Sequence, residues 1–329
     1  MSIHSHELKM YGEIKLFAGT ASPDLSQKIA EYLNTSLCGR DIILFPNDNI
    51  FTKLHGSVRG QDVYVIQTTS APVQRNLMEL LILLQTLRLD SAARITAVVP
   101  YLCYARSDRK DQPRVPITGR LVADMIEVAG ADRYMTIDPH SGQIQGFFSI
   151  PGDVLTSAHL MIDYVNKNLR QYLKDPVVVT VDLGYAKKGR NFAAGINAPI
   201  AFIEKRRVAN NAKAEALTII GEVKNRDVFL VDDEIDTGGS IEQAVNLLKA
   251  GGARRIYIAF IHPVFSLNAA ERLAALPVTE FITTDSIPIS AENCTLLGER
   301  LTVLSIAPLL GEVILRAHEG RSVGEMFNE

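Results

Sequence analysis

The sequence has no tryptophan, only three cysteines and no excess of basic residues. Cys38, Cys103 and Cys294 are odd in number and lack CxxC spacing, which favours reduced thiols in a cytoplasmic protein over a disulfide framework. Lys and Arg number 34 against 37 Asp and Glu, a formal net charge of -3. That balance excludes a protein that coats nucleic acid, so any phosphate chemistry must use local clusters of charge.

Hydrophobic runs are also short. Leu80 to Leu84 is typical of them, and none approaches the roughly 18 apolar residues of a membrane span. The opening residues, MSIHSHELKMYGEIKLF, lack the apolar core of a secretory signal. We therefore expect a cytoplasmic protein with no membrane or nucleic-acid partner.

What the sequence does contain is an alternation of apolar runs and amphipathic segments over 329 residues, enough for two domains. It predicts an α/β fold with mainly parallel sheets flanked by helices, divided near residues 150–165 at the Pro151-Gly152 turn. Ser240 and Gln243 have the spacing of a capping box that would start a helix. The predicted strands are 63–66, 95–99, 134–137, 177–181, 228–231 and 256–261, and the predicted helices are 76–88, 117–129 and Ser240 to Gly251 or Gly252.

The sharpest local signal is the segment Val228 to Ser240, VFLVDDEIDTGGS. An apolar strand ends in two carboxylates, and a loop with two glycines and two hydroxyls leads into a helix. Ligands bind at the carboxyl ends of strands in such sheets, and glycine amides at a helix N-terminus suit a phosphate. Carboxylates accept hydrogen bonds from vicinal sugar hydroxyls, so the segment predicts a ribose 5-phosphate site; an acidic turn with an ordinary helix cap is the alternative. The predicted site comprises Asp232, Asp233, Asp236, Thr237, Gly238, Gly239 and Ser240.

This segment resembles the phosphoribosyl-diphosphate motif of type I phosphoribosyltransferases and of ribose-phosphate pyrophosphokinases. Pro100 to Lys110, PYLCYARSDRK, and Asp138 to Phe148, DPHSGQIQGFF, are similar to pyrophosphokinase segments that simple phosphoribosyltransferases lack. The resemblance implies two tandem type I phosphoribosyltransferase-like domains. Residues 1–158 would carry the ATP-side motifs and residues 159–329 the sugar loop and catalytic lid, with the last ~20 residues packing back on the first domain.

The same resemblance implies roles for individual residues. His140 would contact the ATP phosphates and, with Asp182, a Mg²⁺ site. Lys205 and Arg207 would be catalytic, on a mobile lid that folds over the triphosphate, although as residues alone a Lys-Arg-Arg run is an ordinary surface. The adenine loop would serve the active site of a neighbouring subunit. The implied ATP contacts are Phe45, Asn47, Asn49, Arg106, Ser107 and His140.

Ser57, Arg59 and Arg114 match positions of an intersubunit effector site for phosphate and ADP in the pyrophosphokinases. An Arg beside a Ser is also a common surface pairing, and that alternative stays open. The family resemblance further implies a homo-oligomer built from dimers, often a hexamer.

Three residues depart from the family pattern: Asn49 stands for Glu, Ser107 for Gln, and Tyr185 for the second glycine of a D-x-G-G turn that begins at Asp182. The first two bear on nucleotide preference and the third on the shape of the pyrophosphate loop. The same turn has the glycine spacing of a Walker A loop, but Arg190 replaces its lysine, so we do not interpret it as one.

The leading hypothesis is therefore a ribose-phosphate diphosphokinase that transfers the diphosphoryl group of Mg-ATP to the C1 hydroxyl of ribose 5-phosphate. A non-catalytic regulatory homologue of such a synthetase, and a phosphoribosyltransferase that consumes the product, are the alternatives. The charges of the chain support phosphate chemistry despite their balance. Residues 101–120 hold five basic and two acidic side chains, residues 185–207 six basic and one acidic, and residues 232–236 four acidic and no basic ones.

Overall fold

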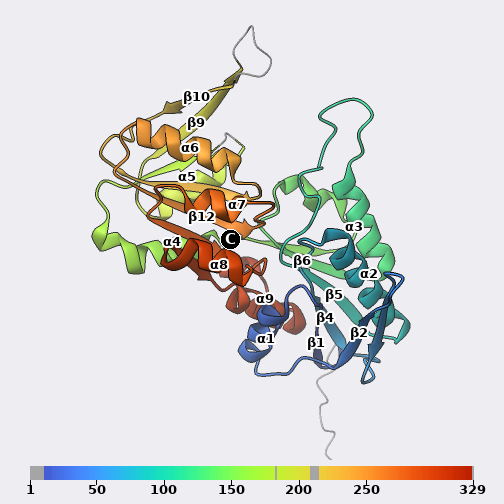
Figure 1. Cartoon of the computed structure of the whole chain (residues 1–329). Coiled ribbons are helices and arrows are strands. Elements are labelled where there is room, and N and C mark those ends of the chain that lie inside the picture. The colour runs from blue at the N-terminus through green and yellow to red at the C-terminus, as the bar shows by residue number, and fades with distance from the viewer. Residues whose placement is uncertain (1–10, 182–183, 208–214, 328–329) are drawn as a thin grey trace, which may run out of the picture. The chain divides into compact units, whose positions relative to one another are not determined.

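The computed structural model describes residues 11–181, 184–207 and 215–327, without the side chains of 205–207, 215–216 and 327 (Figure 1). The chain forms two compact units. Unit 1 comprises Met1–Leu155 and Ala307–Glu329, and unit 2 comprises Thr156–Ile306. The first segment of unit 1 thus ends at Leu155 rather than at residue 158. No helix among the described residues is long and apolar enough to cross a membrane.

Unit 1 contains a five-stranded parallel sheet in the order β1-β4-β5-β6-β7. A separate antiparallel hairpin of β2 and β3 packs against α2, and α9, from the end of the chain, packs against α1 (Figure 1). The strands are β1 (Ile14–Ala18), β2 (Arg40–Leu44), β3 (Ile50–Leu54), β4 (Asp62–Ile66), β5 (Arg94–Val99), β6 (Arg133–Ile137) and β7 (Gly152–Leu155). The α-helices are α1 (Pro23–Tyr32), α2 (Val73–Leu89), α3 (Thr118–Ala129) and α9 (Ala307–Glu319).

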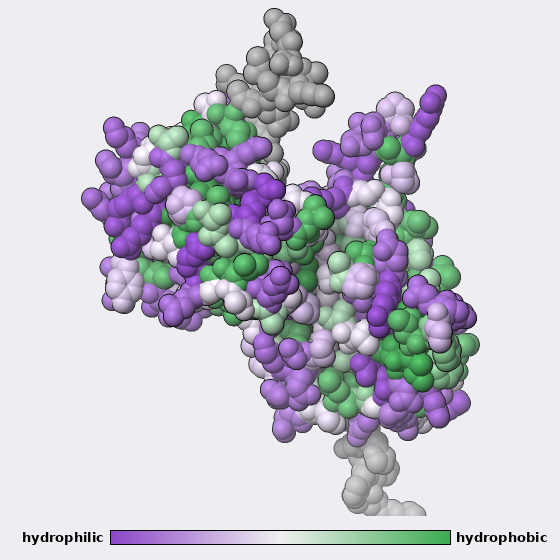
Figure 2. Space-filling view, viewed as in Figure 1, coloured by the Kyte–Doolittle hydropathy of each residue, from purple (hydrophilic) through white to green (hydrophobic). Residues whose placement is uncertain are grey.

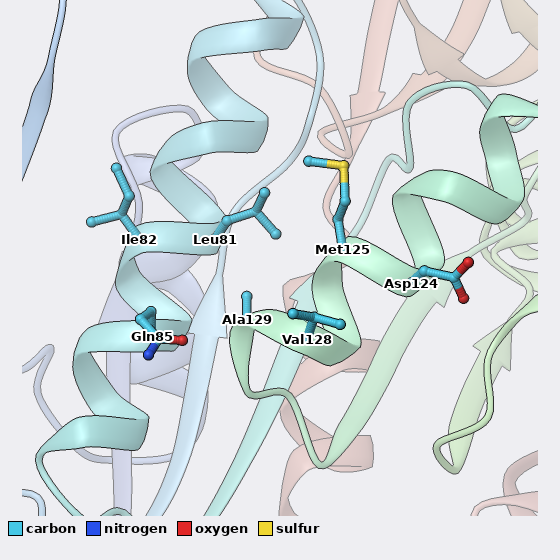
Figure 3. A pocket seen from close by; sticks show the side chains of 7 residues that line it. All are labelled: Leu81, Ile82, Gln85, Asp124, Met125, Val128 and Ala129. Carbon is cyan, nitrogen blue, oxygen red and sulfur yellow. The ribbon is translucent and has the colours of Figure 1, made fainter.

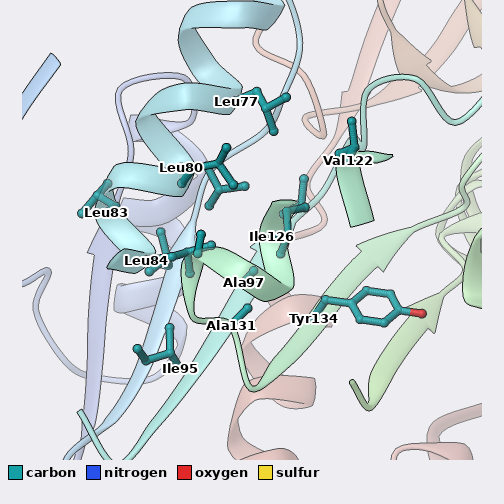
Figure 4. Packing of buried hydrophobic residues seen from close by; sticks show 14 of the residues in the cluster. Leu77, Leu80, Leu83, Leu84, Ile95, Ala97, Val122, Ile126, Ala131 and Tyr134 are labelled. Atoms are coloured by element: carbon teal, nitrogen blue, oxygen red, sulfur yellow. The ribbon is translucent and has the colours of Figure 1, made fainter. Parts of the chain in front are cut away.

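The core of unit 1 lies between the sheet and helices α2 and α3 (Figure 4). Leu80 and Leu84 of α2 and Ile126 of α3 are completely buried, and they face the apolar side chains of β5. The ring of Tyr134 stacks on Phe148 with 3.7 Å between centroids, which closes the cluster at its edge. This packing fixes the sheet whose carboxyl ends carry the unit 1 motifs.

Unit 2 contains a seven-stranded sheet in the order β10-β9-β8-β11-β12-β13-β14, parallel except for the β9–β10 pair. The strands are β8 (Val177–Thr180), β9 (Ile200–Arg207), β10 (Glu215–Ile220), β11 (Asp227–Ile235), β12 (Arg255–Pro263), β13 (Glu280–Thr284) and β14 (Leu301–Leu304). The α-helices are α4 (Ala158–Tyr164), α5 (Ala186–Gly195), α6 (Gly239–Ala250), α7 (Ala269–Ala274) and α8 (Ala291–Leu297).

The predicted strands and helices are confirmed in type and approximate position, and the fold is the α/β architecture expected. The capping-box prediction at Ser240 is wrong. Helix α6 begins at Gly239, and its N-cap is Gly238, at φ 76°, with no side-chain hydrogen bond to the first turn. The left-handed turn at Gly238 starts the helix two residues before Ser240 could cap it.

Each unit has a buried carboxylate at the edge where its parallel strands begin. In unit 1, Asp62 accepts two hydrogen bonds from Arg94, Nε to Oδ1 at 2.7 Å and Nη2 to Oδ2 at 2.6 Å. In unit 2, Asp227 accepts the equivalent bidentate pair of hydrogen bonds from Arg254, of which Nε to Oδ1 is 2.8 Å. Both carboxylates are fully buried, so each requires its guanidinium partner.

The C-terminal helix completes the unit 1 pair. Nδ1 of His318 lies 2.8 Å from Asp62 Oδ2, and Arg94 Nη2 donates to the Ala317 carbonyl at 3.0 Å. The Tyr64 hydroxyl donates to the same carboxylate at 2.9 Å, and burial, together with the Asp62 charge, raises the pKa of that hydroxyl. In unit 2 the backbone N–H of Lys174 takes the corresponding place, 2.8 Å from Asp227 Oδ2.

Candidate substrate sites at the carboxyl ends of the strands

The acidic segment of unit 2 extends β11 instead of ending it. Asp232, Asp233 and Glu234 are strand residues, and the loop proper begins at Asp236. Each backbone N–H of the pair Asp233 and Glu234 donates to the carboxylate of the residue before it, at 2.9 Å. The carboxylates are therefore oriented by their own backbone. Asp233 and Glu234 are buried, whereas Asp232 and Asp236 are partly exposed.

The phosphate side of the predicted sugar loop is the start of α6. Gly238 provides a positive φ and no side chain, so the N-cap residue itself offers no side-chain acceptor to the N–H groups of the first helical turn. Thr237 and Ser240 are exposed beside these groups. Unpaired amides at a helix N-terminus, with the helix dipole, favour an anion. The seven predicted sugar-phosphate residues thus lie within one segment of the chain, with carboxylates at one end and helix amides at the other.

A segment that the sequence did not single out supports this loop. The N–H of Phe265 donates to the Ile235 carbonyl, and the N–H of Ser266 to the Asp236 carbonyl, both at 3.0 Å. Phe265 has a positive φ of 48° and is buried against Phe260. The available signal was positional, because this segment follows the strand that pairs with β11.

The predicted pyrophosphate turn precedes α5 in the sequence. Asp182 lies outside the described residues. Tyr185 is the N-cap of α5 at φ -87°, an ordinary backbone conformation, and Lys188 Nζ lies 5.5 Å from the centre of its ring. A Cβ added to Gly189 would lie 2.3 Å from Thr180 Cγ2. Gly189 is therefore explained by close packing of α5 on β8, which agrees with the rejection of a Walker A loop.

The predicted catalytic residues Lys205 and Arg207 lie at the end of β9, paired in register with Leu217 and Glu215 of β10. Their side chains are outside the described part of the structure, as are residues 208–214, where the lid was predicted.

Unit 1 places Arg106, Ser107 and His140 after neighbouring strands, β5 and β6. Arg106 and His140 are exposed. The Ser107 hydroxyl accepts from the Thr118 N–H at 3.1 Å and its carbonyl from the Gly119 N–H at 3.0 Å. Ser107, one of the three residues that depart from the family pattern, thus holds the start of α3.

The predicted adenine loop is the turn of the β2–β3 hairpin. Asn49 and Asn47 are exposed, and the Asn49 N–H donates to Asn47 Oδ1 at 3.3 Å. Phe45 is 44 % exposed, and its ring centroid lies 6.0 Å from that of Phe51. Figure 2 shows a hydrophobic area over this hairpin; its large exposed apolar residues are Ile43, Leu44, Phe45 and Phe51. An exposed aromatic ring beside two amides suits a planar base.

The predicted effector residues lie on two segments of unit 1. Ser57 and Arg59 follow β3, where the Arg59 N–H donates to Ser57 Oγ at 3.3 Å. Arg114 is exposed in the loop before α3, at a positive φ of 66°.

The described residues contain no group of three or more His, Cys, Asp or Glu side chains able to hold a metal ion. Mg²⁺ commonly keeps several waters and binds through one or two carboxylates plus substrate phosphates. Of the two residues predicted to contact Mg²⁺, His140 is exposed after β6, and Asp182 lies outside the described residues.

A groove of about 430 Å³ lies between α2 and α3 of unit 1 (Figure 3). Its walls are apolar apart from Gln85 and Asp124. It contains none of the predicted site residues, and an apolar surface with one carboxylate does not suit a phosphate. Its other lining residues are Leu81, Ile82, Met125, Val128 and Ala129.

Most of the chain is similar to known proteins of one family. Residues 14–130 match the N-terminal domain of ribose phosphate pyrophosphokinase, and residues 204–328 match the phosphoribosyl synthetase-associated domain. The chain is 45 % identical over 315 residues to a ribose-phosphate pyrophosphokinase of Caldanaerobacter subterraneus, covering 95 % of this chain and 98 % of that protein. It is 42 % identical over 314 residues to the Aquifex aeolicus protein of that name, covering 95 % and 99 %. The crystal structure of phosphoribosylpyrophosphate synthetase from Mycobacterium smegmatis superimposes with a TM-score of 0.88 at 40 % identity, over 94 % of this chain and 100 % of that one.

Proposed function

The chain belongs to the ribose-phosphate pyrophosphokinase family and is an enzyme of that activity; we propose that it transfers the diphosphoryl group of Mg-ATP to the C1 hydroxyl of ribose 5-phosphate. The products are phosphoribosyl diphosphate and AMP. The non-catalytic alternative is disfavoured because the relatives that match almost the whole chain are named as pyrophosphokinases.

The observation that carries the sugar assignment is the geometry of the β11–α6 segment. Asp232 and Asp233 lie at the end of the strand, and the uncapped amides of α6 lie a few residues further along the chain. Ribose 5-phosphate has vicinal hydroxyls at one end and a phosphate at the other, so the two ends of the segment match the two ends of the sugar. The carboxylates accept from the 2- and 3-hydroxyls, and the amides with Thr237 and Ser240 hold the phosphate.

The transfer needs no covalent nucleophile from the protein. The C1 hydroxyl must be held in line with the β-phosphorus, and charge on the phosphate oxygens must be neutralised. Lys205 and Arg207 supply positive charge at the triphosphate. Arg106 binds ATP, and Phe45 with Asn47 and Asn49 holds the base.

Mg²⁺ is the expected metal, and when bound it neutralises phosphate charge. We assign its protein contacts to His140 and Asp182. His140 is exposed at the carboxyl end of β6, where it orients the phosphate tail. A single imidazole and a single carboxylate bind Mg²⁺ weakly. We therefore expect the affinity of the protein for Mg²⁺ to be higher when ATP is bound.

The direct test is AMP formation by the purified chain with Mg²⁺, ribose 5-phosphate and each of ATP, GTP, CTP and UTP. Activity of the chain alone rules out the regulatory-subunit alternative. Asn49 can donate as well as accept hydrogen bonds, so we expect relaxed base selectivity. A strict preference for ATP would refute that expectation.

Lys205→Ala tests the catalytic assignment. We expect kcat to fall on the order of 10³-fold or more, with little change in KM for ribose 5-phosphate, because charge neutralisation matters most in the transition state. Lys167→Ala is the matched control, since Lys167 is an exposed lysine of the same unit paired with Asp163. A rise in KM for ribose 5-phosphate as large as the fall in kcat would contradict the assignment.

Asp233→Asn tests the sugar site separately, because it should weaken ribose 5-phosphate binding in calorimetry without ATP, whereas unchanged affinity would remove Asp233 from the site.

We also propose a dimer-based homo-oligomer, with Ser57, Arg59 and Arg114 binding phosphate or ADP as effectors. Light scattering measures the assembly, and activity titrated with ADP in Arg59→Ala measures the effector site.

A further inference from the structure

A buried histidine lies beside the acidic segment and has no role in the transfer proposed above. His262 is the penultimate residue of β12 and is 2 % exposed. Its Nδ1 lies 2.9 Å from Ser286 Oγ, and Ser286 is itself fully buried. The Ser286 hydroxyl also lies 3.3 Å from the Ile261 carbonyl. One edge of the imidazole is therefore fixed by the segment after β13.

The strand register places this histidine next to Glu234. The pairing of β11 with β12 aligns Asp232 with Phe260 and Glu234 with His262. Glu234 is 6 % exposed, and residues 232–236 contain no basic side chain. A buried carboxylate requires a polar or charged partner. His262 is the polar residue that the register sets directly alongside it.

Glu234 is linked in turn to the sugar-binding carboxylates. Its N–H donates to Asp233 Oδ1, and the N–H of Asp233 donates to Asp232 Oδ1. The chain that leaves His262 also binds the chain that leaves Glu234, through Phe265 and Ser266. A displacement of Glu234 would therefore change the direction of the Asp233 and Asp232 carboxylates.

We propose that His262, held by Ser286, is a positioning residue that fixes Glu234 and thereby orients Asp232 and Asp233 toward ribose 5-phosphate. It does not touch the substrate. The inference rests on the proposed function, since it concerns the sugar site of that reaction. Glu234 accordingly serves as an internal support, and not as a third ligand of the sugar.

The test compares steady-state kinetics of the full chain with those of His262→Ala, His262→Asn and His262→Gln. His262→Ala should raise KM for ribose 5-phosphate about tenfold or more, the effect of disturbing one buried hydrogen-bonding group, and leave KM for ATP within about twofold. In the His262→Asn variant the side-chain amide would lie near the position of the histidine Nδ1, and in the His262→Gln variant it would lie near the position of Nε2. His262→Asn should therefore keep the fold but not the sugar affinity, whereas His262→Gln should recover much of that affinity.

Ser286→Ala gives a second test that leaves the imidazole in place and should raise KM for the sugar by a smaller factor. In a double-mutant cycle, His262→Ala should have less effect on KM when Glu234 is already glutamine. Equal rises in KM for both substrates, an unchanged sugar KM, full recovery by His262→Asn, or additive effects in the cycle would each overturn the inference. Inactivity of the unmodified chain would instead refute the proposed function, so the two failures are distinguishable.

Discussion

Units 1 and 2 carry the same kind of ion pair at the edge where their parallel strands begin, but they complete it differently. Asp227 of unit 2 is bound by Arg254 and by the backbone N–H of Lys174, 53 residues away in sequence. Asp62 of unit 1 is bound by Arg94 and by His318, which is 256 residues away. Unit 2 therefore closes its pair within its own continuous segment, whereas unit 1 uses the last helix of the chain.

Two similar folds in one chain can therefore depend on distant parts of that chain to different degrees. Unit 2 contains the proposed sugar site, and its ion pair requires only residues between Thr156 and Ile306. Unit 1 is discontinuous in sequence, and the His318 contact to its buried carboxylate forms only when α9 is in place.

Removal of residues 307–329 should unfold unit 1 and spare unit 2. Leu309, Leu310, Val313 and Ile314 of α9 are buried, and at about 1.5–3 kcal/mol each their loss costs on the order of 6–12 kcal/mol. A whole domain is stable by only about 5–15 kcal/mol. Cys103 is a reporter for unit 1, because burial raises the pKa of its thiol to about 11 and the folded protein should resist alkylation.

The measurement is the alkylation rate of Cys103 at pH 8, with hydrogen exchange of β11 and β12 as the report on unit 2. Exposed Cys294 is an internal control, since it should react at the same rate in both chains. Continued protection of Cys103 in the truncated chain would show that unit 1 does not depend on α9.

Arg94→Ala should destabilise unit 1 by about 3–5 kcal/mol, because it leaves a buried carboxylate without its cation. Arg254→Ala should cost unit 2 less, since the Arg254 side chain is 32 % exposed against 10 % for Arg94 and solvent weakens such pairs. Urea unfolding followed by exchange in each unit measures both. Arg94→Lys is the control that keeps the positive charge but loses the bidentate hydrogen bonds to Asp62. Equal losses in the two units would break the contrast.

His318→Ala should destabilise unit 1 by about 2 kcal/mol, the usual range for a hydrogen bond to a charged group. His318→Asn retains an N–H near the Nδ1 position and should recover part of the loss. No equivalent side-chain variant exists in unit 2, where the donor is a backbone amide. If His318→Ala unfolds at the same urea concentration as the unmodified chain, the helix is held by its apolar face alone.

Ser290→Ala should cost unit 2 about 1 kcal/mol, because the Ser290 side chain caps α8 by accepting from the Asn293 N–H. Asn268→Ala is the matched control, since the N-cap of α7 makes no side-chain hydrogen bond. The loss should be confined to unit 2, and a change in Cys103 protection would contradict the independence of the two units.

The central strands could be predicted from sequence because they are buried on both faces, as in 63–66 and 228–231. The β2–β3 hairpin was missed as a pair of strands because it is partly exposed and its turn, Phe45 to Asn49, was interpreted as a binding loop. The extension of β11 as far as Ile235 was missed because carboxylates suggest a loop. Their backbone-to-carboxylate hydrogen bonds are visible only in the structure.

The candidate site also has some residues that could be predicted from the sequence and others that could not. Contiguous motifs such as Asp232 to Ser240 could be predicted because one segment contains the whole chemical pattern. His262 could not, because its relevance depends on the register of β12 against β11 and on Ser286, 24 residues further along the chain. The start of α6 was placed two residues late because the φ of Gly238 is a conformational fact that spacing does not reveal.

The place of α9 in unit 1 also has a consequence for biosynthesis. As the chain leaves the ribosome, every residue of unit 2 is available before Ala307 to Glu319 has been made. Domains generally fold as they emerge, the N-terminal one first. Here we expect the order to be inverted, because the half that is translated first lacks α9 and the His318 contact to Asp62 until translation is nearly complete.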